Sequence, residues 1–297
     1  MSVQFGRWNF DGALVEPDCI NSARSALAAY GPDGEGSYCA EAVRVIYRAF
    51  HTTEEAAPVT QPYKSRSGVV ITWDGRLDNR EDLVRELQGG ATLADNDVSI
   101  VAAAYDHWET KCFERLIGDW AVSIWNPREK LLILAKDFIG TRPLYYSIER
   151  NGIQWSTILD PLVPSDRRTF SLEEEYLAGW FGSLPAAHLT PYVGIEDVPA
   201  ACFVTITPRR SAVQKYWDFD GSKRIRYHRD ADYEEHFRTV LAHAVRRRLR
   251  SHTPILAELS GGMDSSAIVC MADSLTPAGP KIDTVSYYAD CEPSWDE

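Results

Sequence analysis

The chain has 297 residues, of which 44% are hydrophobic and 25% charged, and its formal net charge is −12. This length exceeds what one hydrophobic core usually serves, so two domains are expected. The negative charge disfavours nucleic acid as a partner. The sequence contains no run of 18 apolar residues and no signal-peptide pattern at its start, which predicts no membrane partner and a cytoplasmic protein.

The first 210 residues are rich in expected strands. Apolar and β-branched runs bounded by turn residues predict strands at 67–75, 119–126, 130–137, 143–149 and 152–157, and two more within 201–217. Between them, helices are expected at 78–87 and 96–108. Short turn sequences join consecutive strands into hairpins, and this pattern favours an α+β domain dominated by antiparallel pairing.

The sequence changes in character at residue 218. The polar stretch "DFDGSKRIRYHRD" (218–230) has no periodicity and is interpreted as a linker, so the predicted domains are 1–217 and 231–297. The second domain alternates a helix, a strand, a glycine loop, a helix and a strand, which indicates a parallel α/β sheet. The expected elements are helix 231–250, strand 253–259, helix 265–275 and strand 282–288. One crossover cannot cover a parallel sheet, so this domain is expected to be incomplete.

The stretch "ELSGGMDSSAIV" (258–269) has the composition of an anion-binding loop. Backbone N–H groups at a helix start are unpaired and the helix dipole adds positive charge, while glycines let the backbone approach a ligand. Phosphate is the usual ligand of such a loop. Asp264 suits a Mg²⁺ ion that bridges its carboxylate to phosphates. No lysine follows the glycines, so this is not the G-x-x-x-x-G-K-[ST] loop.

The string S-G-G-x-D-S-S after an apolar strand resembles the pyrophosphate-binding loop (PP-loop) of the N-type ATP pyrophosphatases. Those enzymes cleave ATP between its α- and β-phosphates and adenylate a carboxylate or carbonyl oxygen. The resemblance implies ATP and Mg²⁺ as cofactors, with Asp264 on the metal. For Leu259 and Tyr287, which would contact adenine, a plain place in the strand core is an equal alternative. The residues implied in binding ATP or pyrophosphate are Leu259, Ser260, Gly261, Gly262, Asp264, Ser265, Ser266 and Tyr287.

The first domain resembles the glutaminase half of the asparagine synthetase family. The stretches that carry the resemblance occur in the family's order and include "YGPDGEG" (30–36), "WDGRLDNREDL" (73–83) and "LIGDWAVSIWN…LLILAKDFIGTRPLYYS" (116–147). The resemblance covers nearly the whole chain. It implies an Ntn-hydrolase-like αββα sandwich of antiparallel sheets, followed by the start of a parallel-sheet PP-loop domain.

The start of the chain departs from this family. Its working glutaminases begin Met-Cys-Gly, and the freed N-terminal cysteine is both nucleophile and base. Here Ser2 takes that position. A serine with its own α-amino group can act as an N-terminal nucleophile, but its hydroxyl depends more heavily on a base than a thiol does. The alternative is that Ser2 is simply a common second residue.

The glutamine pocket departs from the family as well. By resemblance, Arg48 matches the arginine that holds the glutamine carboxylate, and Asp97 the aspartate that takes its amino group. The family's N-G-E segment reads Asp74-Gly75-Arg76. A negative charge beside a developing oxyanion would raise the barrier. Glutaminase activity is therefore not expected, and Arg48 and Asp97 are then expected to pair or cap locally.

A degenerate glutaminase domain joined to an intact ATP loop resembles β-lactam synthetases and, through "WDGRLDNREDL" and "YRAFHTTEE" (47–55), lasso-peptide macrolactam synthetases. This implies an ATP-dependent ligase that adenylates a carboxylate and closes an amide with an amine of the same molecule. The substrate would be a precursor peptide or a small molecule, and a leader-binding protein or peptidase would be a partner. The alternatives are an asparagine synthetase, using glutamine or ammonia, and a non-catalytic scaffold. The chain as given is not expected to complete the reaction by itself.

Overall fold

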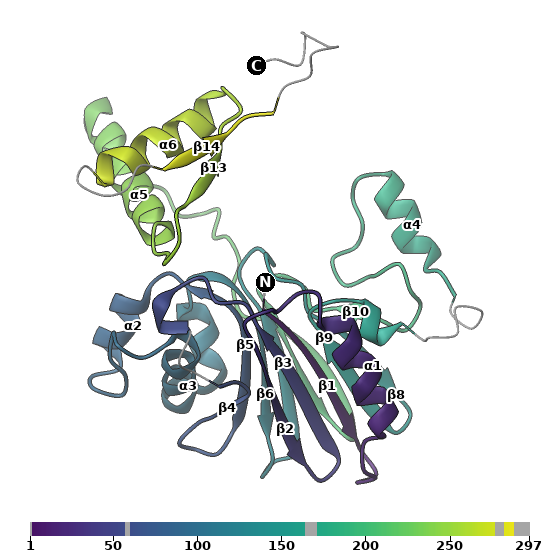
Figure 1. Ribbon diagram of the computed structural model, residues 1–297. Coiled ribbons are helices and arrows are strands. Elements are labelled where there is room, and N and C mark those ends of the chain that lie inside the picture. The colour runs from purple at the N-terminus through teal and green to yellow at the C-terminus, as the bar shows by residue number, and fades with distance from the viewer. Residues whose placement is uncertain (1, 57–59, 164–170, 277–281, 288–297) are drawn as a thin grey trace. The chain divides into compact units, whose positions relative to one another are not determined.

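The computed structural model describes residues 2–56, 60–163, 171–276 and 282–287. It forms two compact units, one of residues 1–51 and 55–219 and the other of residues 52–54 and 220–297 (Figure 1). The boundary after residue 219 lies inside the polar stretch 218–230. Residues 288–297 of the predicted second domain lie outside the described residues.

Strands outnumber helices in the described parts of the chain. The strands are β1 (Val3–Asn9), β2 (Gly34–Ala40), β3 (Val43–Ala49), β4 (Tyr63–Lys64), β5 (Val70–Leu77), β6 (Gly118–Asn126), β7 (Leu131–Lys136), β8 (Tyr145–Glu149), β9 (Gly152–Ser156), β10 (Glu196–Asp197), β11 (Cys202–Thr207), β12 (Arg210–Lys215), β13 (Leu256–Glu258) and β14 (Asp283–Val285). The helices are α1 (Pro17–Leu27), α2 (Arg80–Glu86), α3 (Asp97–Trp108), α4 (Glu174–Phe181), α5 (Asp230–Arg248) and α6 (Met263–Leu275), with 3₁₀ turns at Glu54–Ala56, Glu109–Arg115 and Asp160–Leu162.

The first unit is built on two six-stranded sheets. Their strand orders are β10-β8-β9-β1-β3-β2 and β12-β11-β7-β6-β5-β4. Within the described residues every strand pair of these sheets is antiparallel. The antiparallel hairpins predicted at β6–β7, β8–β9 and β11–β12 are confirmed, because short turns connect them.

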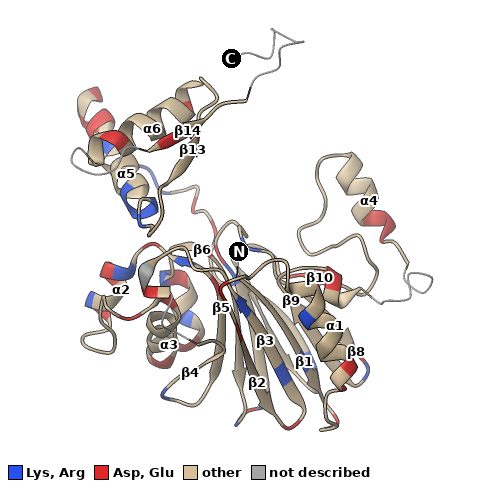
Figure 2. Cartoon of the chain, viewed as in Figure 1, with Lys and Arg blue, Asp and Glu red and all other residues tan. Residues whose placement is uncertain are grey.

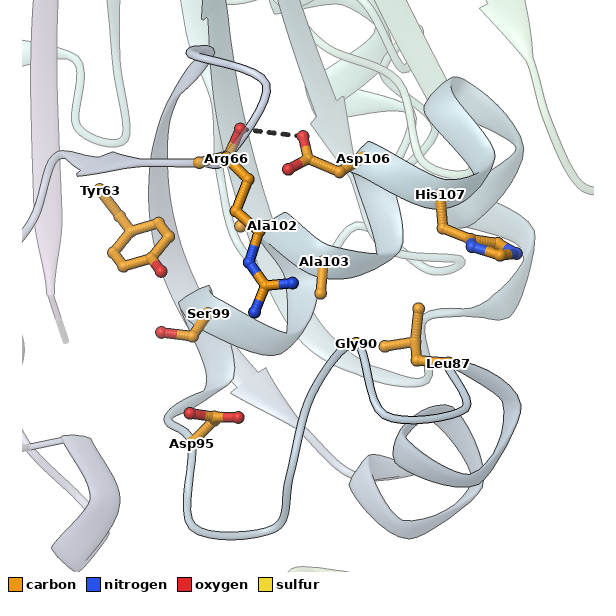
Figure 3. Close-up of a pocket in the computed structure, with 11 residues that line it drawn as sticks. Tyr63, Arg66, Leu87, Gly90, Asp95, Ser99, Ala102, Ala103, Asp106 and His107 are labelled. Carbon is orange, nitrogen blue, oxygen red and sulfur yellow. Dashed lines mark hydrogen bonds between the residues drawn. The ribbon is translucent and has the colours of Figure 1, made fainter.

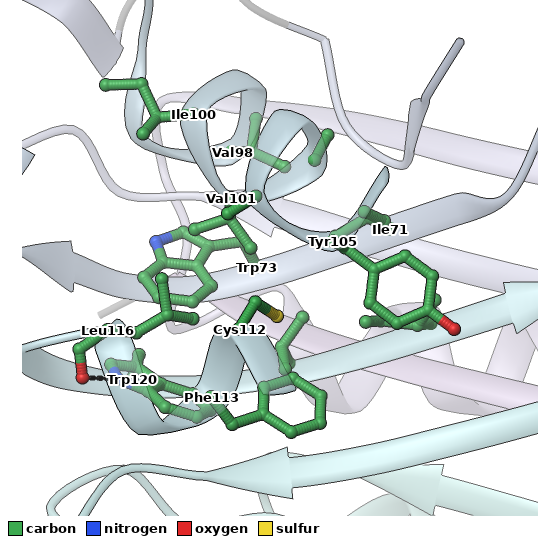
Figure 4. Packing of buried hydrophobic residues seen from close by; sticks show 14 of the residues in the cluster. Ile71, Trp73, Val98, Ile100, Val101, Tyr105, Cys112, Phe113, Leu116 and Trp120 are labelled. Atoms are coloured by element: carbon green, nitrogen blue, oxygen red, sulfur yellow. Dashed lines mark hydrogen bonds between the residues drawn. The ribbon is translucent and has the colours of Figure 1, made fainter. Parts of the chain in front are cut away.

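Three apolar layers hold these sheets and helices together. One core cluster lies between the sheets and joins Trp8 and Trp155 of the first to Leu132 and Val204 of the second. A second packs α2 and α3 onto the outer face of the β5–β6 sheet, and a third packs α1 onto the outer face of the β1–β3 sheet. Figure 1 shows the helices on these two outer faces, and Figure 4 shows the second cluster around Trp73. The expected αββα sandwich is confirmed.

Strand β5 decides which side chains enter the space between the sheets. Ile71 and Trp73 belong to the cluster under the helices, whereas Val70 belongs to the cluster between the sheets. Because successive side chains of a strand point to opposite faces, Asp74 is directed between the sheets. A Cβ on Gly75 would lie 2.4 Å from the carbonyl oxygen of Asp119 on the neighbouring strand, so this position requires glycine.

The second unit is a strand–loop–helix–strand crossover preceded by a helix, as predicted. Strands β13 and β14 pair in parallel, with Leu256 opposite Asp283. Both are shorter than the predicted 253–259 and 282–288, because only three residue pairs form the ladder. In Figure 2 acidic residues mark the first turn of α5 and arginines its last turn, which complements the helix dipole. Within the described parts of the chain, no helix combines the length and apolarity that a membrane crossing needs.

Candidate functional site

The hydroxyl of Ser2 is held at the start of β1. It accepts hydrogen bonds from the backbone N–H of Phe50 at 2.9 Å and from the phenol of Tyr47 at 2.9 Å, and it donates to the Phe50 carbonyl at 3.3 Å. Burial raises the pKa of Tyr47 above its usual range, so the phenol stays protonated and remains a donor. Ser2 is 8% exposed. Its hydroxyl is therefore fixed in the position predicted for a nucleophile, but its proton points to a carbonyl, which is not a base.

Asp74 is the most deeply buried charged position of the predicted glutamine pocket. It is 1% exposed, and its Oδ2 has no hydrogen-bond partner in the described part of the chain. Burial raises the pKa of this carboxyl to about 7, although the nearby Arg142 guanidinium acts to lower it. The neutral acid is therefore accessible near neutral pH, unlike that of an ordinary exposed aspartate. The sequence-based argument assumed an ionised carboxylate, whereas a neutral acid can donate a hydrogen bond.

Arg48 is committed to contacts within its own unit. Its Nη1 lies 3.0 Å from Oε2 of Glu35, and its Nη2 donates to the Ala28 carbonyl at 3.3 Å. Glu35 also pairs with Arg24 at 2.7 Å. Partial burial acts to raise the pKa of Glu35, but the hydrogen bonds from both arginines outweigh it and hold the pKa below its usual value. Only the buried Nε of Arg48 lacks a partner among the described residues.

The other charges of the predicted pocket are also paired internally. Asp97 accepts from Nη1 of Arg80 through Oδ1 and from the backbone N–H of Leu77 at 2.8 Å through Oδ2. Arg76 pairs with Asp78 at 2.8 Å. These ion pairs leave the two glutamine-holding positions, Arg48 and Asp97, neutralised by their own neighbours.

Four residues that shape this region were missed by the sequence analysis. Tyr47 binds Ser2, Arg142 lies beside Asp74, Glu35 pairs with Arg48, and Arg80 pairs with Asp97. All four lie in stretches that carry the family resemblance: Glu35 in "YGPDGEG", Tyr47 in "YRAFHTTEE", Arg80 in "WDGRLDNREDL" and Arg142 in the stretch 116–147. No local pattern predicts their contacts, because the partner of each lies at least 13 residues away in the sequence.

The predicted anion-binding loop connects β13 to α6 in the second unit. Gly261 has φ +90°, a conformation that favours glycine. Gly262 is the residue before α6 and has no side chain to cap its first N–H groups. The hydroxyls of Ser260 and Ser265 lie 3.1 Å apart, and Ser260 Oγ accepts from the Gly262 N–H at 3.3 Å. These contacts close the loop around the open start of the helix.

The positions flanking this loop are only partly as expected. The Leu259 N–H donates to the Val285 carbonyl at 2.9 Å, and Ser286 Oγ donates to the Leu259 carbonyl at 2.6 Å. Leu259 is half-buried beside β14, but Tyr287 is 79% exposed, so its side chain is not part of a strand core. The Ser266 N–H donates to the Gly262 carbonyl at 3.2 Å, which leaves its hydroxyl as the donor for a ligand.

The loop has the chemistry that a phosphate group with Mg²⁺ requires. Uncapped N–H groups and the positive end of the α6 dipole suit an anion. Asp264 is exposed in the first turn of α6, where a carboxylate can reach a metal held by phosphates. Across the described ranges no three His, Cys, Asp or Glu side chains gather as metal ligands. Any Mg²⁺ here would therefore depend on the nucleotide for most of its ligands.

Comparison with protein families divides the chain in the same place as its sequence character. A family model described as a glutamine amidotransferase domain matches residues 3–217. A second model, described as asparagine synthase, matches residues 236–297.

The matches to individual relatives cover only part of each relative's length. Asparagine synthetase (glutamine-hydrolyzing) 3 of Bacillus subtilis (strain 168) is 28% identical over 223 residues, which is 72% of this chain and 35% of that protein. Amidase chry2 of Gibberella zeae is 25% identical over 272 residues, which is 89% of this chain and 40% of that protein. The chain thus spans well under half the length of the curated relatives it matches.

Among solved structures, glutamine phosphoribosylpyrophosphate amidotransferase from B. subtilis, complexed with ADP and GMP, has a TM-score of 0.50 at 14% identity. The match covers 96% of this chain and 65% of that one. At this level of identity the likeness supports the fold of the chain alone.

Proposed function

Because the chain belongs to the asparagine synthetase family, with an N-terminal glutamine amidotransferase domain, we propose that it is part of an ATP-dependent ligase that forms carbon–nitrogen bonds. The observation that carries this proposal is the loop between β13 and α6. Gly261 has φ +90° there, and Gly262 precedes a helix start whose first N–H groups have no side-chain cap. Such a start binds phosphate. ATP would supply the adenylyl group that activates a substrate carboxylate.

In this proposal each loop residue has one task. Backbone N–H groups at the start of α6 and the hydroxyls of Ser260 and Ser265 hold the leaving pyrophosphate. Asp264 holds Mg²⁺ against it. The exposed Tyr287 and Leu259, the residue directly after β13, would border the position of the adenine ring. Stabilising the negative charge that builds up on pyrophosphate lowers the barrier to adenylation.

We further propose that the attacking amine belongs to the substrate itself, so that a precursor peptide is closed to a macrolactam, with a leader-binding protein or peptidase as a partner. Support comes from the first unit. Arg48 pairs with Glu35, Asp97 pairs with Arg80, and the Ser2 hydroxyl donates to a carbonyl. With these contacts the charges of Arg48 and Asp97 are taken up by their own neighbours instead of being free to hold glutamine, and an amine within the substrate makes ammonia unnecessary.

Asparagine synthesis is an equally supported second function. The B. subtilis relative bears that name, and the buried Asp74 favours it too. With a pKa of about 7, the neutral Asp74 can donate a hydrogen bond to an oxyanion, as an amide would at this position. In that function Ser2 would be the nucleophile that releases ammonia from glutamine.

The test uses the full-length protein that contains this chain, with ATP, Mg²⁺ and one of two substrates. One reaction contains any short precursor peptide encoded beside the gene, and the other contains aspartate with ammonium or glutamine. Mass spectrometry follows the products and chromatography follows the nucleotides. Loss of one water from the peptide, with release of AMP and pyrophosphate, is expected. Asparagine formation with an unchanged peptide would instead establish the second function.

Two variants assign any activity to the loop. Asp264→Asn is expected to abolish AMP release, because the carboxylate that holds Mg²⁺ is lost. Asp273→Asn changes a matched exposed acid near the other end of α6 and is expected to have no effect. Full AMP release by Asp264→Asn would show that this loop does not hold the reacting nucleotide, whereas the non-catalytic scaffold predicts no AMP release from parent or variant.

A further inference from the structure

The first unit contains a cavity of ≈ 240 Å³ beside α3. It lies between that helix, β4 and the segment that joins α2 to α3, and it is shown in Figure 3. None of the predicted glutamine-pocket positions lines it. The cavity is smaller than the ~300–1,000 Å³ sites of drug-sized ligands. Its size therefore suits a molecule with only a few heavy atoms.

Two opposite charges face this cavity without pairing with each other. Arg66 reaches along α3 toward Ala102 and Ala103 in Figure 3, and Asp95 lies on the segment before α3. No ion pair or side-chain hydrogen bond engages the Arg66 guanidinium in the part of the chain that the structure describes. Asp95 uses Oδ2 to accept from Thr92, through its N–H at 2.7 Å and its hydroxyl at 3.1 Å. Its Oδ1 remains available to a ligand.

The other acid at the cavity is already satisfied. Asp106 accepts hydrogen bonds from the hydroxyls of Ser65 and Ser67 at 2.9 and 2.6 Å and from the Ser67 N–H at 3.3 Å. The contacts of Asp106 with these serines hold the turn that carries Arg66. On the opposite side Arg80 donates to the carbonyls of Leu93 and Asp95. Both charged residues thus lie on backbone that hydrogen bonds hold in place, although the Arg66 side chain itself is exposed.

We propose that this cavity binds a small zwitterion of the free α-amino-acid class. Its carboxylate would pair with the Arg66 guanidinium, which can donate two parallel N–H bonds to such a group. Its ammonium would donate to Oδ1 of Asp95, and a short apolar side chain would pack on Ala102 and Ala103. A simple anion would be repelled by Asp95, and a simple cation by Arg66. Only a ligand that carries both charges can pair with Arg66 and with Asp95 at the same time.

Equilibrium dialysis of the chain with radiolabelled L-alanine tests this proposal, with propionate and ethylamine as competitors that each carry one of the two charges. We expect saturable binding of L-alanine and weaker competition by either half-molecule. Absence of binding up to about 10 mM, where a millimolar Kd would be evident, would overturn the proposal. Equal competition by propionate would also overturn it, because the ammonium would then contribute nothing.

Four variants localise the site. Arg66→Gln and Asp95→Asn are each expected to raise the Kd for L-alanine by about tenfold or more. Ala103→Leu should do the same by filling the cavity without changing a charge. Arg128→Gln removes an exposed arginine outside the cavity and should bind like the parent chain. An unchanged Kd in Asp95→Asn, or in Ala103→Leu, would refute the assigned site.

The outcome is independent of the ligase proposal. Asp264→Asn lies in the other unit and is expected to bind L-alanine normally. Failure of the loop variant to change AMP release would therefore leave this inference intact, and failure of alanine binding would leave the ligase proposal intact.

Discussion

The two units of the chain differ in how completely they cover their own apolar side chains. In the first, both faces of each sheet are covered and large side chains such as Trp120 and Trp155 are fully buried. In the second, Val245 and Ala272 are the buried apolar residues of the described part. Its exposed large apolar side chains include Phe237, Val240, Leu256, Met263, Ile268 and Tyr287.

The difference follows from sheet architecture. An antiparallel sandwich buries one face of each sheet against the other and needs only short helices outside. A parallel sheet needs cover on both faces, and β13 and β14 form only a two-stranded one. The charges show the same contrast, because the first unit pairs its pocket charges internally while the loop of the second leaves Asp264 exposed. The first unit pairs most of its predicted pocket charges internally, whereas the second leaves the acid of its predicted loop exposed.

The largest expected effect is in hydrogen exchange. Amides of β6 and β7 in the first unit should exchange on the order of 10³-fold more slowly than those of β13 and α6, because few buried apolar contacts oppose opening in the second unit. Exchange followed by mass spectrometry on the whole chain measures both. Similar protection in the two units would show that the second unit has cover that its exposed side chains do not reveal.

A pair of leucine substitutions sharpens the comparison. Leu132 is 0% exposed between the two sheets, and Leu256 in β13 is 64% exposed. Leu132→Ala should destabilise the first unit by about 2–5 kcal/mol, since it removes buried methyl groups and leaves a cavity. Leu256→Ala should change the second by less than about 0.5 kcal/mol. Hydrogen exchange of β7 and β13 amides measures the free energy of opening of each unit. Equal losses of this free energy in the two variants would contradict the difference in burial between the units.

Asp74 is the exception within the closed unit, and its substitution should change how stability depends on pH. Its pKa is about 7 in the folded chain and has a reference value of 3.8. Between these values the folded state binds more protons than the unfolded state, so stability falls as pH rises from about 4 to about 7. Each pKa unit corresponds to about 1.4 kcal/mol, discounted by any local relaxation.

Asp74→Asn should remove this slope. The variant is expected to gain stability relative to the parent chain as pH rises, and to keep a constant difference above pH about 7. Urea denaturation followed by tryptophan fluorescence at a series of pH values measures it. Parallel pH profiles for parent and variant would mean that the Asp74 carboxyl titrates normally.

The smallest expected effect concerns the ion pair that holds Arg48. Glu35→Gln breaks the pairs with Arg48 and Arg24, which are both partly exposed, and should cost no more than about 1 kcal/mol. Glu114→Gln, at an exposed acid elsewhere in the unit, is the matched control for urea denaturation. A loss of unfolding free energy well above that of the control and above this limit would mean that the stability of the first unit depends on its surface ion pairs.

Much of the fold was predictable from local patterns, but not all of it. The hairpins at β6–β7, β8–β9 and β11–β12 follow from alternating apolar runs and short turns. The sequence analysis placed no strand before residue 67, although β1 to β3 lie there. β2, "GEGSYCA", combines two glycines with polar residues and has no apolar alternation. It is a strand because β3 pairs with all seven of its residues.

The candidate site, too, was predictable from the sequence only in part. The place of the glycine loop at a strand-to-helix junction was predictable because its signal lies in adjacent residues, Ser260 to Ser266. The glutamine-pocket positions remain a prediction from the family resemblance, and the sequence did not predict which charges they pair with. Whether Arg48 is free depends on Glu35 in the neighbouring strand β2.

The sequence by itself predicted the two-part organisation and the antiparallel pairing of the first unit, because hydrophobic periodicity acts over a few residues, and its glycine placement indicated an anion-binding loop. The αββα sandwich was expected only from the resemblance to the asparagine synthetase family. Only the tertiary structure decided which charges neutralise one another, the raised pKa of Asp74, and the cavity that Arg66 shares with Asp95. Burial, charge proximity and unpaired hydrogen-bonding atoms are properties of the space around a side chain. That space is formed by segments far apart in the chain.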